Sequence, residues 1–207
     1  LSAFNINAQT TWFPLNSGTT AQIEKSYFAN SMIGYAVGNN GIILKSTNGG
    51  INWAQQNAGT TEILLGLFFT DSLTGYASGR NIYKTTNGGS SWNINFSGNG
   101  FFLMQSIFFT NRDKGYICGS KSQYGLILKT TNAGLTWDTT LLSLPVNEIK
   151  LYDIHFTDEN NGIVCGTRAI DPSYPIVYKT TNGGLTWENK TPSITGLTYY
   201  YLTSVKM

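Results

Sequence analysis

The chain has 207 residues and a formal net charge of +2; charged residues make up 12% of it, aromatic residues 14%, and glycine occurs 23 times. This length allows one or two domains with a sizeable core, and the composition argues against both disorder and long helices. No run of basic residues marks a surface for nucleic acid or an anionic membrane. The abundant Gly, Thr, Asn and aromatic residues are typical of short strands joined by tight turns.

The first nine residues, "LSAFNINAQ", differ from the rest of the chain. They resemble the tail of a secretory signal peptide, with the small residue Ala8 at the position of cleavage. An ordinary disordered start is the alternative. No other segment approaches the roughly 20 apolar residues that span a bilayer. We therefore expect residues 1–9 to be a signal-peptide remnant of a bacterial protein that is secreted or displayed at the cell surface, without a membrane span.

One nine-residue phrase occurs four times along the chain, as "KSTNGGINW", "KTTNGGSSW", "KTTNAGLTW" and "KTTNGGLTW". Its tryptophans are 39, 45 and 50 residues apart. Upstream of each copy lies an element such as "GYAVG" (residues 34–38), and further upstream an apolar run ends on a Phe six residues before the first Gly of that element. Every unit thus holds four short apolar or alternating stretches and no helical period.

Four strands in a unit of about 40–50 residues predict an all-β fold, a β-propeller of four-stranded antiparallel blades. We name the strands A to D from the axis outward. A solenoid rung would be shorter, and a sandwich would not repeat one turn motif in every unit. In the second unit, strands A to D are expected at 63–70, 75–79, 81–86 and 91–97. The propeller is expected over residues 10–207, with blades at about 20–58, 59–98, 99–142 and 143–192.

The two ends of the chain also align with the repeat. "TTWFPLNSGT" (residues 10–19) matches "INWAQQNAGT" (51–60), and "LTSVKM" (202–207) matches "LYDIHF" (151–156). A lone strand D would therefore precede the four blades, and residues 193–207 would begin a further blade with a lone strand A. We expect an incomplete ring of a longer protein, whose open edges are covered by further blades or by a partner. A closed four-bladed ring is the alternative.

The repeated phrase is expected to form the hairpin between strands C and D. We call its Ser/Thr-x-Asn-x-Gly-x-x-Trp core the box. The Asn side chain can bond turn amides, the Gly accepts positive φ, and the Trp can fold over the turn. The lysine before each box is expected to cover its own hairpin with its stem. The structural residues of the four boxes are Asn48, Gly50, Trp53, Asn87, Gly89, Trp92, Asn132, Gly134, Trp137, Asn182, Gly184 and Trp187.

The box resembles the Asp-box, or bacterial neuraminidase repeat, with Asn in place of the usual Asp. The longer "GYAVGNNGIILKSTNGGINW" is similar to the repeat of photosystem II stability/assembly-factor-like propellers. The resemblance covers nearly the whole chain and implies the propeller fold. It leaves the function open, because such propellers include sialidases, xyloglucan-type glucanases and non-catalytic assembly factors. Since Asn lacks the charge that a hard cation prefers, we expect no metal at the boxes.

In a propeller, the BC hairpins and DA connections lie on one face, which we call the loop face. The AB and CD turns, with the boxes, lie on the opposite box face. The BC loops lengthen from blade to blade, and variable loops on a rigid scaffold commonly carry function. Arg, Tyr and Phe are also residue types that anchor protein or sugar contacts. The candidate binding residues on the loop face are Arg80, Phe101, Tyr124, Arg168, Tyr174 and Tyr199.

Catalytic candidates are few. A glycosidase needs two carboxylates about 5–9.5 Å apart, and Glu148 and Asp171 are the best pair on one face; as ordinary residues they would be solvated loop acids. His155, the only histidine, is expected to form a buried hydrogen bond with Asp153 rather than a catalytic pair. Cys118 and Cys165 are expected to be buried free thiols. These residues supply no zinc set, and no Gly-rich loop cradles a phosphate, so no cofactor is expected.

The sequence therefore predicts a secreted or cell-surface, non-catalytic propeller scaffold. It would bind a protein or polysaccharide through the loop face, and would have no nucleic-acid partner. The alternative is a glycoside hydrolase of the glucanase type, whose active cleft is completed by further blades.

Overall fold

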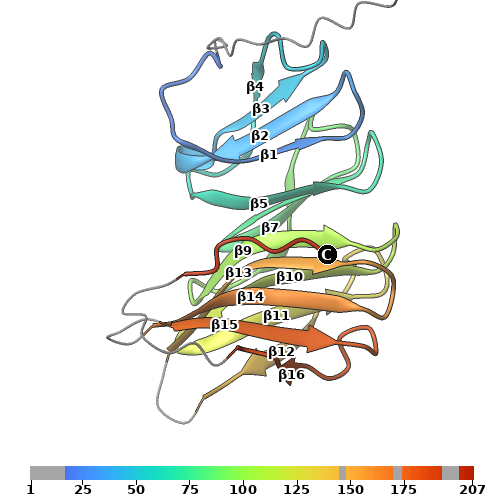
Figure 1. The fold of residues 1–207 in the computed structure, drawn as a ribbon. Helices are drawn as coiled ribbons and strands as arrows, with labels where there is room; N and C mark the ends of the chain where they lie inside the picture. Colours follow the sequence, from blue (N-terminus) through green and yellow to red (C-terminus); the bar gives the residue numbers. More distant parts are fainter. Residues whose placement is uncertain (1–16, 145–147, 170–173, 193–200) are drawn as a thin grey trace, which may run out of the picture.

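The computed structural model describes residues 17–144, 148–169, 174–192 and 201–207. Their strands form four four-stranded antiparallel sheets (Figure 1). The first comprises β1 (Ile23–Phe28), β2 (Gly34–Gly38), β3 (Ile43–Ser46) and β4 (Ala54–Gln56), with the short 3-10 turn η1 (Asn39–Gly41). The second comprises β5 (Leu64–Phe69), β6 (Gly75–Gly79), β7 (Asn81–Thr85) and β8 (Asn93–Ser97). The third comprises β9 (Phe102–Phe109), β10 (Gly115–Lys121), β11 (Tyr124–Thr130) and β12 (Asp138–Leu142). The fourth comprises β13 (Glu148–Phe156), β14 (Gly162–Ala169), β15 (Tyr174–Thr180) and β16 (Glu188–Asn189).

Within every sheet, the strands are hydrogen-bonded in chain order. The first strands of successive sheets, β1, β5, β9 and β13, contact one another and form the inner edge. In Figure 1 the blue first sheet lies at the top, the second sheet follows it, and the third and fourth sheets overlap in the lower half of the view. The predicted architecture of four blades, each with strands A to D, is confirmed.

Each pairing of strands A and B contains one β-bulge, at the same place in every blade. In the second blade, Leu64 pairs with Gly79 and Gly66 with Ser78, so that Leu65 is the additional residue. The other three blades show the same register shift. A bulge increases the local twist of a strand pair, and its repetition gives every blade the same twist at the inner edge.

The two glycines of the "GYxxG" element are explained by close approach. A Cβ on Gly75 would lie 2.5 Å from ring carbons of Phe69, and a Cβ on Gly79 would lie 2.0 Å from the carbonyl oxygen of Ile63. The first glycine lets the Phe ring lie flat over the neighbouring strand, and the second lets strand A approach strand B at the bulge. The constant six-residue spacing between Phe and Gly follows from this contact.

The core lies between successive blades. The Phe69 ring is stacked on Tyr35 of the first blade, with 3.8 Å between centroids, and meets Trp92 edge-on at 5.9 Å. The same trio of rings recurs at the next two interfaces, where Phe109 and Phe156 are the central rings. Burial of such rings, with each ring contact adding about 0.5–1.5 kcal/mol, makes these interfaces the main source of stability.

Hydrogen bonds also connect each blade to the next. Tyr35 Oη and Lys45 Nζ both donate to the carbonyl oxygen of Gly88 in the second box, at 2.9 and 2.7 Å. Tyr76 Oη and Lys84 Nζ make the same contacts with Ala133 in the third box. The sequence predicted that the stems of these lysines cover their own hairpins; the ammonium groups of Lys45 and Lys84 also bond the neighbouring box. Their ammonium groups reach the neighbouring blade because the box carbonyl there is a fixed acceptor.

The chain ends can be compared with the sequence only in part. Residues 1–9 and most of the expected first strand D lie outside the described residues. Residues 201–207 join no ladder among the described residues. They nevertheless lie against β13, where Ser204 Oγ and Val205 N donate to Asp153 Oδ2 at 2.8 and 3.0 Å. In Figure 1 this segment is the dark red trace that ends near β9 and β13.

Candidate functional site

The boxes use their polar groups inside the turn. In the second box, Thr85 Oγ1 accepts from Gly89 N and donates to Asn87 Oδ1, both at 2.9 Å. Asn87 Oδ1 also accepts from Ser91 N, and Asn87 Nδ2 donates to the Ser91 hydroxyl. The third and fourth boxes repeat all four contacts, and the first repeats all but the last. The polar residues of each box therefore stabilise the turn of their own CD hairpin, and we call them turn fasteners.

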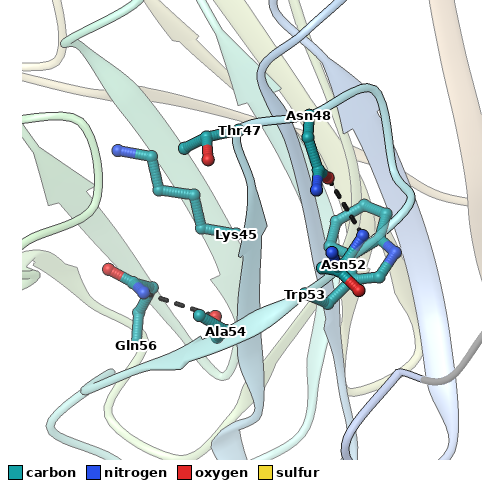
Figure 2. Close-up of a pocket in the computed structure, with 7 residues that line it drawn as sticks. All are labelled: Lys45, Thr47, Asn48, Asn52, Trp53, Ala54 and Gln56. Atoms are coloured by element: carbon teal, nitrogen blue, oxygen red, sulfur yellow. Dashed lines mark hydrogen bonds between the residues drawn. The ribbon is translucent and has the colours of Figure 1, made fainter.

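A shallow cavity of about 280 Å³ lies beside the first box, between β3 and β4 (Figure 2). Some of its polar groups already have partners: Asn48 Oδ1 accepts from Asn52 N, and the Lys45 ammonium donates to the next blade. Gln56 Nε2 bonds the carbonyl of Ala54 at 3.3 Å. Lys45, Asn48 and Gln56 thus make contacts within the protein, and we assign no binding site to this cavity.

The loop face carries the predicted binding residues. Arg80 is exposed, and its Nη1 donates to the carbonyl of Gly100 at 2.9 Å. That bond holds the connection between the second and third blades, where Phe101 is 69% exposed. Arg80 and Phe101 therefore lie on neighbouring loops of the same face.

The third blade adds a second cation. Lys121 lies with its Nζ 5.0 Å from the centre of the Phe102 ring, and Tyr124 pairs with Lys121 across the tight BC turn. Phe102 itself is only 9% exposed and packs in the core, edge-on to Phe96. Of the two neighbouring phenylalanines, only Phe101 is thus available on the surface.

The fourth blade joins two predicted residues directly. The Arg168 guanidinium lies over the Tyr174 ring, with 5.0 Å from Cζ to the ring centre, on adjacent strands β14 and β15. Both line a cavity of about 270 Å³ together with Leu144, Pro175 and Asn189. Within the described part of the chain, Arg168 Nε is buried without a hydrogen-bond partner. Tyr199, the remaining predicted binding residue, lies outside the described residues.

The catalytic candidates are used otherwise or cannot be placed. Glu148 forms an ion pair with Lys150 at 3.3 Å, and Asp171 lies outside the described residues. The expected bond between Asp153 and His155 was wrong. Asp153 instead accepts from Ser106 Oγ at 2.7 Å, besides its contacts with residues 204 and 205. His155 packs against the Phe108 ring. Asp153 and His155 are two apart on β13, so their side chains point the same way, and each contacts a residue of the third blade rather than the other.

The thiols are buried and free, as predicted. Burial raises the pKa of Cys118 well above its ordinary value and that of Cys165 to about 11, so neither is a reactive thiolate at neutral pH. Among the described residues, no group of three or more His, Cys, Asp or Glu side chains could hold a metal ion. The described part of the chain also has no helix long and apolar enough to cross a membrane.

One feature of the box face was not foreseen from the sequence. The penultimate residue of every strand A carries a half-buried ring; these residues are Tyr27, Phe68, Phe108 and His155. The rings contact in series, with 5.0, 5.7 and 4.8 Å between centroids. Two rings of this row, Tyr27 and Phe68, border a cavity of about 420 Å³ at the box-face end of β1, β5 and β9, which we call the axial pocket; its lining also includes Phe109, Thr110, Asn111 and Arg112. The sequence signal for this row of rings was that His155 aligns with an aromatic residue in each of the other three repeats.

Comparison with known proteins bears on the fold. No protein-family model matches the chain, and no curated protein matches its sequence. Among solved structures, YCF48 bound to a D1 peptide matches with a TM-score of 0.64 and 16% identity, over 86% of this chain and 55% of that one. An ancestral GH74 enzyme matches with a TM-score of 0.68 and 22% identity, over 87% of this chain and 25% of the enzyme.

The GH74 xyloglucanase from Xanthomonas campestris matches with a TM-score of 0.65 and 12% identity, over 86% and 32% of the two chains. This chain thus spans about half of YCF48 and a quarter to a third of these enzymes. At such identities the likeness concerns the fold alone. Together with the four antiparallel sheets, it identifies the chain as a β-propeller built like YCF48 and the GH74 enzymes.

Proposed function

We propose that this propeller is a non-catalytic scaffold that binds a polypeptide segment carrying carboxylate groups on its loop face. The observation that carries the proposal is that three successive blades each present one cation beside an aromatic residue there. These are Arg80 near Phe101, Lys121 over Phe102, and Arg168 over Tyr174.

The chemistry of these cations favours an anionic partner. Within the described ranges, none of the three forms an ion pair, whereas Lys150 on the same face is neutralised by Glu148. Arginine binds carboxylates through two parallel hydrogen bonds, and an aromatic ring behind the cation restricts its motion. Arg168 Nε is buried and has no acceptor among the described residues, so the fold itself does not use this donor there.

The similar proteins support a binding role without deciding the ligand. YCF48 was solved with a bound D1 peptide, whereas the GH74 proteins are enzymes. A hydrolase would need a matched pair of carboxylates, and Glu148 is held by Lys150. With three cations that form no ion pair among the described residues, and with Glu148 held by Lys150, the loop face fits a polypeptide partner better than a sugar chain. We also propose export, on the basis of residues 1–9, to be checked by fractionation of the cells that make the protein.

The test uses the full chain and three probes: an acidic peptide with aromatic residues, the same peptide with Gln and Asn in place of its acids, and xyloglucan oligosaccharide. We expect the acidic peptide to bind at least tenfold more tightly than its neutral analogue in calorimetry. Arg168→Ala should weaken that binding about tenfold, because it removes a charge-assisted contact. Arg112→Ala, on the box face, is the matched control and should change nothing.

Equal affinity for the two peptides would contradict the proposal. Xyloglucan binding without peptide binding would replace it with a sugar-binding scaffold. Release of reducing sugar that is abolished by Glu148→Gln or Asp171→Asn would support the hydrolase instead.

A further inference from the structure

The axial pocket lies on the box face, away from the residues of the proposed function, and its lining is unlike that of the other two cavities described above. Its volume of about 420 Å³ falls within the range of roughly 300–1,000 Å³ that is usual for small-molecule sites, while the cavities of about 270 and 280 Å³ fall below it. Three blades contribute to it through the ends of their A strands. The pocket is therefore built by the packing of blades and not by one hairpin.

The walls of the pocket are aromatic. Tyr27 and Phe68 are half-buried, so part of each ring remains accessible, and they lie 5.0 Å apart at an interplanar angle of 44°. The Tyr27 hydroxyl donates to the carbonyl of Phe69 at 2.9 Å, which fixes the ring in place. Phe68 is also fixed, since it contacts Phe108 and Phe109 of the third blade at 5.7 Å. Rigid, partly open rings of this kind favour flat apolar or aromatic ligands.

The rim of the pocket supplies one available cation. The Arg112 side chain is 75% exposed, and its only charged partner among the described residues is Asp71, at 3.7 Å. No hydrogen bond to its guanidinium is formed within the described part of the chain, so its N–H donors are available. The other polar groups of the rim are engaged: Asn111 Oδ1 accepts from Asp113 N and Lys114 N, and Asn111 Nδ2 donates to Glu159.

Asp71 competes with an incoming anion for the Arg112 guanidinium. Its Oδ1 accepts from the backbone N–H groups of Leu73 and Thr74, both at 2.8 Å, and its Oδ2 faces Arg112. The bond to Leu73 N, together with the weaker effects of the Thr74 bonds and Arg112, lowers the pKa of Asp71, so that it stays ionised at neutral pH. An incoming anion would thus share Arg112 with a fixed carboxylate.

We propose that the axial pocket binds a small aromatic carboxylate, with its ring against Tyr27 and Phe68 and its carboxylate on Arg112. Aromatic walls without a cation would select neutral apolar compounds, and a cation without walls would select any anion. Aromatic walls beside a cation would together select a compound that carries both an aromatic ring and a carboxylate. This site does not rest on the proposed function, since it shares no residue with the loop face.

The probes are 2-naphthoate and its neutral analogue 2-naphthalenemethanol, titrated into the full chain by calorimetry. We expect 2-naphthoate to bind with a dissociation constant below about 1 mM, at least fivefold more tightly than the alcohol. Arg112→Ala should remove this preference while leaving the weak binding of the alcohol. Asp71→Asn should tighten 2-naphthoate several-fold, because an Asn oxygen can keep the two backbone bonds while the competing charge is lost.

Phe68→Leu keeps apolar volume but removes a ring, and it should weaken both compounds. Arg168→Ala on the loop face is the control and should affect neither. Circular dichroism confirms that each variant is folded. Absence of 2-naphthoate binding to the unmodified chain at 1 mM or more would overturn the proposal, as would a charge preference that survives Arg112→Ala. Peptide binding at the loop face is measured separately, so either site can fail alone.

Discussion

The two faces of the propeller differ in how far their contacts repeat from blade to blade. On the box face, the same residues make the same hydrogen bonds in successive blades: in every box the Gly backbone N–H donates to the Ser or Thr hydroxyl oxygen at 2.8–2.9 Å. On the loop face, the turns differ in length, and Arg80, Lys121 and Arg168 form no ion pair among the described residues. Repetition therefore indicates groups that stabilise the hairpins and the packing of blades, and divergence indicates groups available to a partner.

The largest expected effect tests the fastening contacts. Gly75→Ala would place a Cβ 2.5 Å from the Phe69 ring, which cannot move because Tyr35 and Trp92 hold it on two sides. We expect a loss of roughly 3 kcal/mol or more in the free energy of unfolding, measured by chemical denaturation. Gly100→Ala is the matched control on the loop face: φ is +76°, but nothing lies within 4 Å of the new Cβ, so the cost should be about 1 kcal/mol. Equal effects at both positions would contradict the contrast between the faces.

A smaller effect tests the bond between blades and its dependence on pH. Burial, reinforced by Asp113 and Asp71, raises the pKa of Tyr76 from 10.0 to about 12. Between these values the unfolded chain has lost the phenolic proton while the folded chain keeps it, so stability falls as pH rises from 10 toward 12. Tyr76→Phe removes the bond to Ala133 and should cost about 1 kcal/mol at pH 8.

The same variant should also lose less stability than the unmodified chain between pH 9 and 11, as measured by denaturation at the two values. An unchanged slope in Tyr76→Phe would mean that this hydroxyl does not titrate with unfolding.

The smallest effect is expected for Asn132→Asp, which tests the chemistry of the box itself. Asn132 Oδ1 accepts from Thr130 and from Thr136 N, and its Nδ2 donates to the Thr136 hydroxyl. Asn132→Asp keeps the acceptors, and the Thr136 hydroxyl can rotate to donate, so we expect a change within about 0.5 kcal/mol. Asn132→Ala loses all three bonds and should cost about 1–2 kcal/mol in thermal or chemical denaturation. A large cost for Asp would show that the amide donor, and not only the turn acceptor, is required.

Much of this architecture could be predicted because each blade repeats its own local contacts. The spacing of Phe69 and Gly75, the box hydroxyl and the box Asn are within one hairpin or one strand pair, and their pattern is visible along the chain. The directions of Lys45 and Asp153 could not be predicted, because their partners belong to neighbouring blades. Which of Phe101 and Phe102 is buried was likewise decided by packing against Phe96.

By itself, the sequence determined the fold class, the order of strands in each blade and the position of the turn fasteners. These depend on contacts between residues close in sequence, which recur at a readable period. Only the tertiary structure decided which side chains meet across blades: the hold of Tyr35 and Lys45 on the second box, the stacking of Arg168 on Tyr174, and the axial pocket. Such meetings depend on the twist and stacking of whole sheets, which no local pattern records.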